Sequence, residues 1–241
     1  MKNLVVVPTY NEKENIKALI GAVLKHPNYH VLVVDDGSPD KTAELVKEVQ
    51  ESEKERVHLI ERSGKLGLGT AYIRGFQFGL EKGYDYIYEM DADFSHNPDD
   101  LIRLREACEE GADLAIGSRY IKEGGVVNWP ADRILISRGG ALYVRLLTFM
   151  PVNDPTAGFI CYKADVLRSI NLDKVEFTGY GFQIEMKYVS WRLGFNIAEV
   201  PIVFKDRELG TSKMSSAIMK EAMIGVLKLR FRNIKKHYLK Y

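Results

Sequence analysis

The chain has 241 residues, 46% of them hydrophobic and 28% charged, and its net charge is +1. This is the composition of an ordinary globular protein with enough chain for one large α/β domain or two small ones, and the small net charge excludes a general attraction to nucleic acid. No apolar run approaches the roughly 20 residues that a membrane-spanning helix needs, and no signal peptide precedes the first predicted strand. We therefore expect a cytoplasmic protein whose contact with a membrane is peripheral.

The first half of the chain alternates short apolar runs with helical stretches. Strands are predicted at residues 4–7, 31–34, 57–60, 86–90 and 114–116. Helices are predicted between them at residues 12–25, 39–50, 70–82 and 99–110, and Asn11 and Ser38 are the expected N-caps of the first two. Strands that are apolar on both faces and separated by helices predict an α/β fold with a mostly parallel sheet that helices cover on both sides.

The second half is less regular. Helices are predicted at residues 133–150, 181–193 and 214–235, a strand at 158–162, a strand interrupted by Pro201 at 197–204, and a polar loop at 205–213. No internal repeat or low-complexity linker divides the chain, so residues 1–241 are expected to form a single domain. Cys108 and Cys161 have no metal-ligand spacing, which predicts two buried thiols in a reducing compartment.

Ligands of parallel sheets bind at the carboxyl ends of the strands. The residues with unusual chemistry follow the predicted strands of this chain, in segments 8–12, 35–38, 63–69, 91–98 and 117–120. No segment matches GxGxxG after the first strand or GxxxxGK[ST], so the sequence predicts neither a dehydrogenase-type dinucleotide fold nor a P-loop.

The triplet Asp91-Ala92-Asp93 places two carboxylates at one strand end. Carboxylate pairs of this kind bind Mg²⁺ or Mn²⁺, which would bridge a diphosphate and stabilise its leaving charge. The alternative is a solvated turn in which Asp93 or Asn97 caps the next helix, and for the isolated triplet that alternative is preferred.

Two further segments carry candidate ligands for a nucleoside. Asp35 and Asp36 can accept hydrogen bonds from a base or a ribose, but Asp-Gly-Ser-Pro is also a good turn sequence. In segment 8–12, the ring of Tyr10 can stack on a base and Glu12 can bind a ribose hydroxyl, whereas the alternative is a cap for the first helix.

Several motifs in this order and spacing resemble the family 2 glycosyltransferases of the GT-A fold. Within that family the chain is similar to the polyprenyl-phosphate mannosyltransferases of the dolichol-phosphate mannose synthase type. The resemblance covers nearly the whole chain and rests on PTYNEKENI, VLVVDDGSPDKT, GLGTAYIRGF, EMDADFSHNPDDL, IGSRY, SRGGALYVRLL, DPTAGFICY and RELGTSKM.

The resemblance implies inverting transfer of mannose from GDP-mannose to a polyprenyl phosphate. Residues 1–120 would be the nucleotide-sugar-binding half, with Mg²⁺ or Mn²⁺ as cofactor. The donor residues that it implies are Pro8, Tyr10, Glu12, Asp36, Asp91, Ala92, Asp93 and Arg119, of which Asp91 and Asp93 would bind the metal. Ser95 stands where the family often has a glutamine, and its contact with the metal is left open.

Residues 121–213 would be the acceptor half. A phosphate monoester carries about −1.5 to −2 charge at neutral pH, so it attacks without a general base and needs cations that hold two anions in line. The implied acceptor-phosphate ligands are Arg119, Arg133, Ser212 and Lys213, and Arg207 and Lys213 would act from a loop that otherwise resembles a solvated surface loop. Asp154 and Glu185 are expected to orient the mannose or the cationic loops, or Glu185 is a polar helix position.

Two segments suit a membrane surface. Residues 133–150 form either an amphipathic interfacial helix, with Arg138 and Arg145 on one face, or a core helix with snorkelling arginines. The final helix, within residues 214–241, is basic with interleaved aromatic residues, which suits an anionic cytoplasmic leaflet. The resemblance leaves open a membrane-anchoring partner subunit.

Two other functions compete with this interpretation. One is transfer of another sugar, such as glucose from UDP-glucose, to polyprenyl phosphate, because the motifs indicate phosphate chemistry better than they indicate the base. The other is a non-catalytic nucleotide-sugar-binding subunit on the same fold, against which the intact Asp91, Asp93, Arg207 and Lys213 argue.

Overall fold

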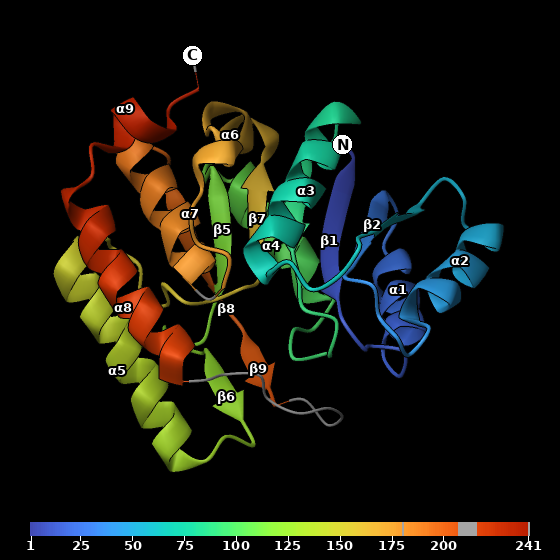
Figure 1. Ribbon diagram of the computed structural model, residues 1–241, viewed down its shortest axis with the longest axis horizontal. Coiled ribbons are helices and arrows are strands. Elements are labelled where there is room, and N and C mark those ends of the chain that lie inside the picture. Colours follow the sequence, from blue (N-terminus) through green and yellow to red (C-terminus); the bar gives the residue numbers. More distant parts are fainter. Residues whose placement is uncertain (180, 207–215, 241) are drawn as a thin grey trace.

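The computed structural model describes residues 1–179, 181–206 and 216–240 (Figure 1). Its first half alternates strands and helices, as the sequence predicts. These elements are β1 (Asn3–Thr9), α1 (Ile16–Leu24), β2 (Tyr29–Asp35), α2 (Thr42–Ser52), β3 (Val57–Glu61), α3 (Leu68–Glu81), β4 (Tyr86–Glu89), α4 (Asp100–Glu109) and β5 (Leu114–Ser118).

The second half adds short strands and the longest helices. In chain order it contains β6 (Gly125–Val127), α5 (Ala131–Thr148), β7 (Ile160–Lys163), α6 (Ala164–Ser169), the 3₁₀ helix η1 (Leu172–Lys174), α7 (Gly181–Leu193), β8 (Ile197–Pro201), β9 (Val203–Lys205), α8 (Ser216–Phe231) and α9 (Ile234–Tyr238). Figure 1 shows α8 lying alongside α5, at the end of the molecule far from α1 and α2.

The main sheet has seven strands in the order β3-β2-β1-β4-β7-β5-β8. All of them run parallel except β7, which is antiparallel to both β4 and β5. The predicted mostly parallel sheet is therefore confirmed. Because parallel strands share a direction, the segments that follow β1, β2, β3, β4 and β5 all leave the sheet at its carboxyl edge.

The core lies on both faces of this sheet. Along β1, Leu4 and Val6 belong to one buried cluster and Val5 and Val7 to the other, since successive side chains of a strand point to opposite faces. On the first face α3 approaches the sheet closely, because a Cβ at Gly75 would collide with the side chain of Val6. This arrangement explains why the strands are apolar on both faces.

The predicted N-caps of the first two helices are wrong. Helix α1 begins at Ile16 with Asn15 as its N-cap, and α2 begins at Thr42. Asn11 has a left-handed φ of 60°, and its N–H donates to the Ser38 hydroxyl over 3.0 Å. That hydroxyl in turn donates to Asp35, 2.6 Å away. The two residues therefore connect the loops after β1 and β2 instead of capping helices.

The predicted strand at residues 197–204 is divided in two. β8 pairs with β5 in the main sheet, whereas β9 pairs with β6 in a separate two-stranded sheet. Between them Ile202 is buried, and its N–H donates to the Ser118 carbonyl over 3.0 Å. The strand partner of the chain therefore changes from β5 to β6 at Ile202. This residue directly follows Pro201, where the sequence predicts the interruption.

The single final helix predicted at residues 214–235 is also divided. Helix α8 ends at Phe231, and the Asn233 side chain caps α9 by accepting the Lys236 N–H over 3.1 Å. Helix α9 then packs on α7, where the Tyr238 hydroxyl donates to buried Glu185 over 2.5 Å. None of the helices in the described ranges combines the length and hydropathy that crossing a bilayer requires.

The two cysteines are free and buried, as predicted. Cys108 on α4 and Cys161 on β7 have their sulfur atoms 3.8 Å apart in the core beneath the sheet.

Candidate active site

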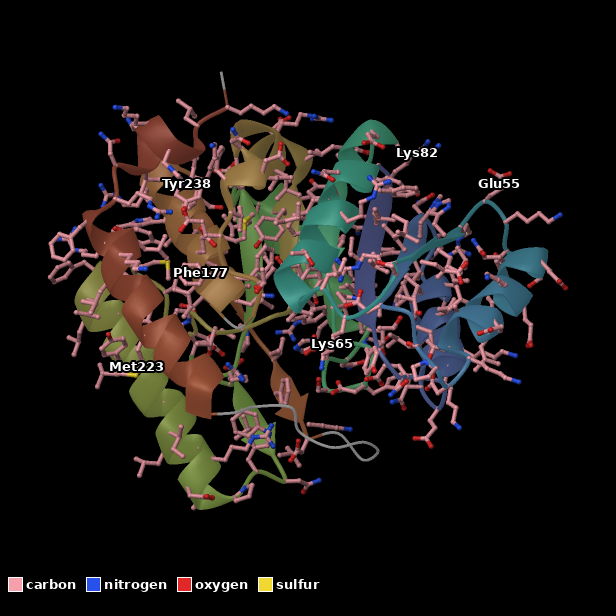
Figure 2. The ribbon with its side chains drawn as sticks, in the orientation of Figure 1. Glu55, Lys65, Lys82, Phe177, Met223 and Tyr238 are labelled. Carbon is pink, nitrogen blue, oxygen red and sulfur yellow. The ribbon has the colours of Figure 1, made fainter. Side chains whose placement is uncertain are left out.

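The loops after β1, β2 and β3 form one connected group at the carboxyl edge. The Lys65 ammonium lies over the Tyr10 ring, 5.2 Å from its centroid, and Figure 2 shows Lys65 at the foot of α3. Buried Asp36 accepts a hydrogen bond of 2.6 Å from the Arg62 guanidinium. Pro8 lies half-buried at the end of β1. Three of the predicted nucleoside ligands therefore lie at the same edge, and Asp36 is oriented by an arginine that sequence reasoning missed.

Asp35 and Glu12 have structural contacts in this group. The Asp35 carboxylate accepts from the Thr9 hydroxyl over 2.8 Å and from both the backbone and hydroxyl of Ser38, so it takes the turn role that the sequence left open. The Glu12 carboxylate accepts from the Asn15 amide over 3.2 Å. The Glu12 carbonyl accepts the backbone N–H groups of Asn15 and Ile16, each over 3.0 Å, so Glu12 joins the loop to the start of α1.

The acidic triplet follows β4 and closes on itself as a turn. The Asp93 carboxylate accepts from the backbone N–H and the hydroxyl of Ser95, at 3.1 and 2.5 Å. The Asp91 N–H donates to Nδ1 of buried His96 over 3.3 Å. Phe94, between these residues, has a left-handed φ of 58°. Ser95 is therefore bound to the second aspartate of the pair.

His96 connects the triplet to the loop before β7. Its ring stacks on that of Phe159, with centroids 4.8 Å apart and planes 9° apart, and meets Phe204 edge-on. Burial lowers the pKa of His96 to about 4, so the ring is neutral at neutral pH and accepts the Asp91 N–H. Sequence reasoning missed His96, although its position three residues after Asp93 was the available signal.

The donor chemistry of the triplet fits a divalent cation. Asp91 and Asp93 offer only oxygen, which Mg²⁺ and Mn²⁺ prefer, and these ions commonly bind one or two carboxylates together with substrate phosphates. The pKa of the buried Tyr72 hydroxyl is raised well above its usual value, mainly by burial and also by the negative charges of both aspartates, among others. Both carboxylates therefore act on Tyr72. Within the described residues, no set of three or more His, Cys, Asp or Glu side chains is arranged around a common point.

A cavity of about 670 Å³ opens beside the triplet. Its walls include Asp93, His96, Arg103, Lys205 and Asp206. This volume lies in the range of small-molecule sites. The cavity therefore joins the second aspartate of the pair to the segment that precedes residue 207.

Arg119 follows β5 and is held by a buried carboxylate. Its Nε and one terminal nitrogen each donate to Asp154 over 2.7 Å, and its backbone N–H donates to the same carboxylate over 3.0 Å. Burial alone would lower the pKa of Arg119, but the hydrogen bonds and charge of Asp154, with a smaller effect of Asp91, raise it. Arg119 therefore stays positively charged near the acidic triplet. Two nitrogens of its guanidinium group already donate to Asp154.

Three aromatic rings surround the same guanidinium. Its central carbon lies 5.1 Å from the centroid of Tyr120, 5.6 Å from that of Trp129 and 5.5 Å from that of Phe204. Rings at these distances attract a cation and restrict its motion. Sequence reasoning predicted the cation and missed the rings: Tyr120 directly follows Arg119 and Trp129 lies ten residues on, whereas Phe204 comes from a distant part of the chain.

The loop that carries Asp154 is held by two charged side chains, half-buried Glu199 and buried Lys187. The Glu199 carboxylate accepts the backbone N–H groups of Asn153 and Asp154 over 2.8 and 3.0 Å. The Lys187 ammonium on α7 donates to the carbonyls of Pro155 and Ala157 over 3.2 and 2.5 Å. Lys187 is fully buried, and an isolated lysine among the apolar residues of a helix gave no sequence signal for this role.

Lys187 faces a second buried polar group. Glu89 on β4 accepts hydrogen bonds from the Tyr162 hydroxyl, over 2.9 Å, and from the Gln183 amide. Burial raises the pKa of Glu89 to about 7, against the lowering effect of Lys187 and of these two donors. Burial also lowers the pKa of Lys187 to about 8.

Stability is expected to depend on pH through Glu89. Its folded pKa of about 7 exceeds its ordinary value of 4.5, so the folded chain binds the proton more tightly than the unfolded chain. The free energy of unfolding therefore contains a contribution that falls as the pH rises from about 5 to about 7. Glu89→Gln is neutral throughout and should remove this contribution, which is of the order of 1–3 kcal/mol.

Urea unfolding of the wild type and Glu89→Gln at several pH values in this interval would measure the effect. Lys187 stays protonated across it in both states, so its titration does not interfere. The same slope of unfolding free energy against pH in both proteins would contradict the assignment to Glu89.

Arg133 and Glu185 also have protein partners. Arg133 donates to Asp206 over 2.7 Å and lies over the Trp129 ring at 4.0 Å, beside the point where residues 207–215 begin. Glu185 is buried and accepts the backbone N–H groups of Glu176 and Phe177, at 3.0 and 2.9 Å, together with the Tyr238 hydroxyl. It therefore joins α7 to the C-terminal segment. The predicted ligands Arg207, Ser212 and Lys213 lie outside the described residues.

Comparisons with known proteins identify the family of this chain. The family model for glycosyl transferase family 2 matches residues 4–170. The polyprenol monophosphomannose synthase of Mycolicibacterium smegmatis is 47% identical over 93% of this chain and 85% of its own length. The undecaprenyl-phosphate mannosyltransferase of Micrococcus luteus is 49% identical over 94% of this chain and 93% of its own.

Two solved structures show the same fold. The glucosyl-3-phosphoglycerate synthase of Mycobacterium tuberculosis, with Mn²⁺, UDP and glucosyl-3-phosphoglycerate, has a TM-score of 0.68 at 20% identity and covers 95% of this chain and 79% of its own. The mannosyltransferase PcManGT of Pyrobaculum calidifontis, with GDP-mannose and Mn²⁺, has a TM-score of 0.57 at 15% identity and covers 96% of this chain and 70% of its own. The chain is therefore a glycosyltransferase with a GT-A-like fold and belongs to glycosyl transferase family 2.

Proposed function

We propose that the protein transfers mannose from GDP-mannose to a polyprenyl monophosphate with inversion at the sugar carbon. The observation that carries the proposal is the placement of the acidic triplet beside a buried arginine at the carboxyl edge of the sheet. Two anions must meet in such a reaction, and this edge offers carboxylates for a cation and a fixed positive charge. The names of the relatives support mannose and polyprenyl phosphate as substrate classes.

Asp91 and Asp93 would hold Mg²⁺ or Mn²⁺ on the donor diphosphate. When bound, that ion supplies charge stabilisation to the leaving diphosphate. The chain itself binds and orients the donor. Tyr10 offers a ring for the base, Glu12 and Asp36 offer carboxylates for the nucleoside, and His96 and Ser95 hold the triplet in its turn.

The acceptor phosphate needs cations and needs no base. Arg119 contributes a fixed positive charge. Arg133 is paired with Asp206, the residue directly before segment 207–215, which contains Ser212 and Lys213. Binding the donor diphosphate and the acceptor phosphate on opposite sides of the sugar carbon favours attack in line, which inverts that carbon. Asp154 orients Arg119, and Lys187 and Glu199 position the loop of Asp154.

The reaction is proposed to take place on the cytoplasmic face of a membrane, with the protein bound peripherally. The outer surfaces of α5 and α8 expose large apolar side chains, and Figure 2 labels Met223 on this surface. They are Leu135, Ile136, Leu142, Leu146, Phe149, Met223, Leu227 and Phe231. Apolar side chains interspersed with basic ones are typical of helices that lie in a bilayer interface.

Transfer of label into the organic phase would test the proposal. We expect radiolabelled GDP-mannose, a short prenyl phosphate and Mg²⁺ or Mn²⁺ to yield a labelled, β-linked mannosyl lipid. Label from UDP-glucose and none from GDP-mannose would overturn the donor assignment. Donor binding without any transfer would indicate a nucleotide-sugar-binding subunit, and transfer only after addition of a membrane fraction would indicate a partner subunit.

A further inference from the structure

A second cavity, of about 280 Å³, lies between α5 and the segments that carry Tyr120 and Asn153. Its walls are Tyr120, Arg138, Ala141, Leu142, Arg145 and Asn153, which we call the α5 pocket. We propose that the α5 pocket binds the phosphate of an anionic bilayer lipid and thereby orients the enzyme on the membrane. This inference rests on the proposed function, because it assigns a headgroup site to the membrane-facing surface described above.

The two arginines of the α5 pocket are available for an anion. They are seven residues apart, which is about two turns of helix, so they share one face. Both are exposed, and neither forms a salt bridge or side-chain hydrogen bond with another residue of the described ranges. By contrast, Arg119 and Arg133 are paired with Asp154 and Asp206.

The other walls of the pocket are suited to a phosphate diester. The Arg138 guanidinium lies 5.7 Å from the Tyr120 ring centroid, which restrains it. The Tyr120 hydroxyl donates to Ser137 over 2.6 Å, so the ring itself is fixed. Asn153 adds an amide, whose nitrogen donates to the Glu199 carboxylate over 2.8 Å, as does the backbone N–H of the same residue. Guanidinium groups bind phosphate oxygens through paired N–H donors, and an amide nitrogen carries a second N–H besides the one that it donates to Glu199.

The surroundings of the pocket indicate that its ligand is a lipid. Leu142, in the pocket wall, is 54% exposed, and Leu135 and Leu146, about two turns before it and one turn after it on the same face, are 74% and 64% exposed. Arg230 of α8 lies 5.2 Å from the ring of Phe149, so the basic surface continues onto the neighbouring helix (Figure 1). A free phosphate or an acidic protein would leave these leucines in water, whereas a bilayer covers leucines and arginines together.

Vesicle flotation without donor or acceptor tests the proposal. The wild type should float with phosphatidylcholine vesicles that contain phosphatidylglycerol. The double variant Arg138→Gln/Arg145→Gln should bind them about 25-fold more weakly, since each basic residue at an anionic surface contributes a factor of about five. Arg74→Gln/Arg168→Gln removes the same charge from exposed positions on α3 and α6 and should bind like the wild type.

A second variant separates a phosphate site from general attraction. Arg138→Lys/Arg145→Lys keeps the charge but lacks the planar fork, so its binding should fall between those of the wild type and the glutamine variant. Unaltered binding of the glutamine variant would overturn the proposal. An equal loss on pure phosphatidylcholine, an equal loss in the control variant, or full competition by inorganic phosphate would overturn it too.

The outcome is distinguishable from failure of the proposed function. Flotation requires no sugar transfer, so an enzyme that floats as expected and transfers no mannose would contradict the proposed function and leave the α5 pocket assigned. If the protein transfers mannose and the Arg138→Gln/Arg145→Gln variant floats like the wild type, only the assignment of the α5 pocket is contradicted.

Discussion

Asp93→Ala is expected to reduce mannosyl transfer by more than about a thousandfold while the fold remains intact. A cation on the leaving diphosphate stabilises the transition state by several kcal/mol, and each tenfold in rate corresponds to about 1.4 kcal/mol. Asp93 supplies one of the two carboxylates for that cation in the proposed site. Steady-state transfer to a short prenyl phosphate, with Mn²⁺ binding followed by electron paramagnetic resonance, would measure both consequences.

The alanine variant also loses a structural contact, because the Asp93 carboxylate accepts from Ser95. Asp93→Asn keeps an oxygen for these donors but is a weaker, uncharged metal ligand, so it should also be inactive and bind Mn²⁺ poorly. Asp99→Ala, at an exposed aspartate of the same loop, should behave like the wild type. Near-normal transfer by Asp93→Asn would contradict the metal-bridging role and assign Asp93 to the turn.

Arg119→Met is expected to lower the free energy of unfolding by about 3–5 kcal/mol, because removal of one partner leaves the other charge buried and unpaired. The Asp154 carboxylate is fully buried and accepts three hydrogen bonds from Arg119. Those bonds hold the pKa of Asp154 below its usual value, although burial alone would raise it. Urea unfolding at neutral pH would measure the loss.

Two further variants show whether the loss comes from the pair. Arg119→Met/Asp154→Asn removes both charges and should regain more than about 2 kcal/mol of the loss. Arg133→Met breaks the half-exposed pair with Asp206 and should cost less than about 1 kcal/mol. A loss of stability for Arg119→Met no larger than that for Arg133→Met would contradict the buried-pair account.

Activity of the same double variant separates two roles of Arg119. If its stability returns and transfer stays absent, the guanidinium is needed at the site for its charge. If both return, Arg119 and Asp154 serve only to hold the loop between α5 and β7, and the acceptor phosphate depends on other cations.

The sequence by itself determined the parallel half of the sheet and the position of the site. Short apolar runs with helices between them required burial on both faces, and β1 to β5 lie where those runs predict. Because the direction of parallel strands is fixed by their connections, the carboxyl-end segments, including the acidic triplet and Arg119, had to reach one edge. These predictions depend on local pattern and chain direction, which are properties of sequence.

Only the tertiary structure decided which charges are paired and where irregular segments end. Asp154 is 35 residues from Arg119, and Lys187 is 30 residues from the Ala157 carbonyl that it binds, so no local spacing indicates these contacts. The division of the final helix at residues 232–233 depends in the same way on the packing of α9 against α7. A buried polar group needs a hydrogen-bond partner, because leaving it unpaired away from water costs free energy. The fold decides which residue supplies that partner, so local sequence patterns do not reveal it.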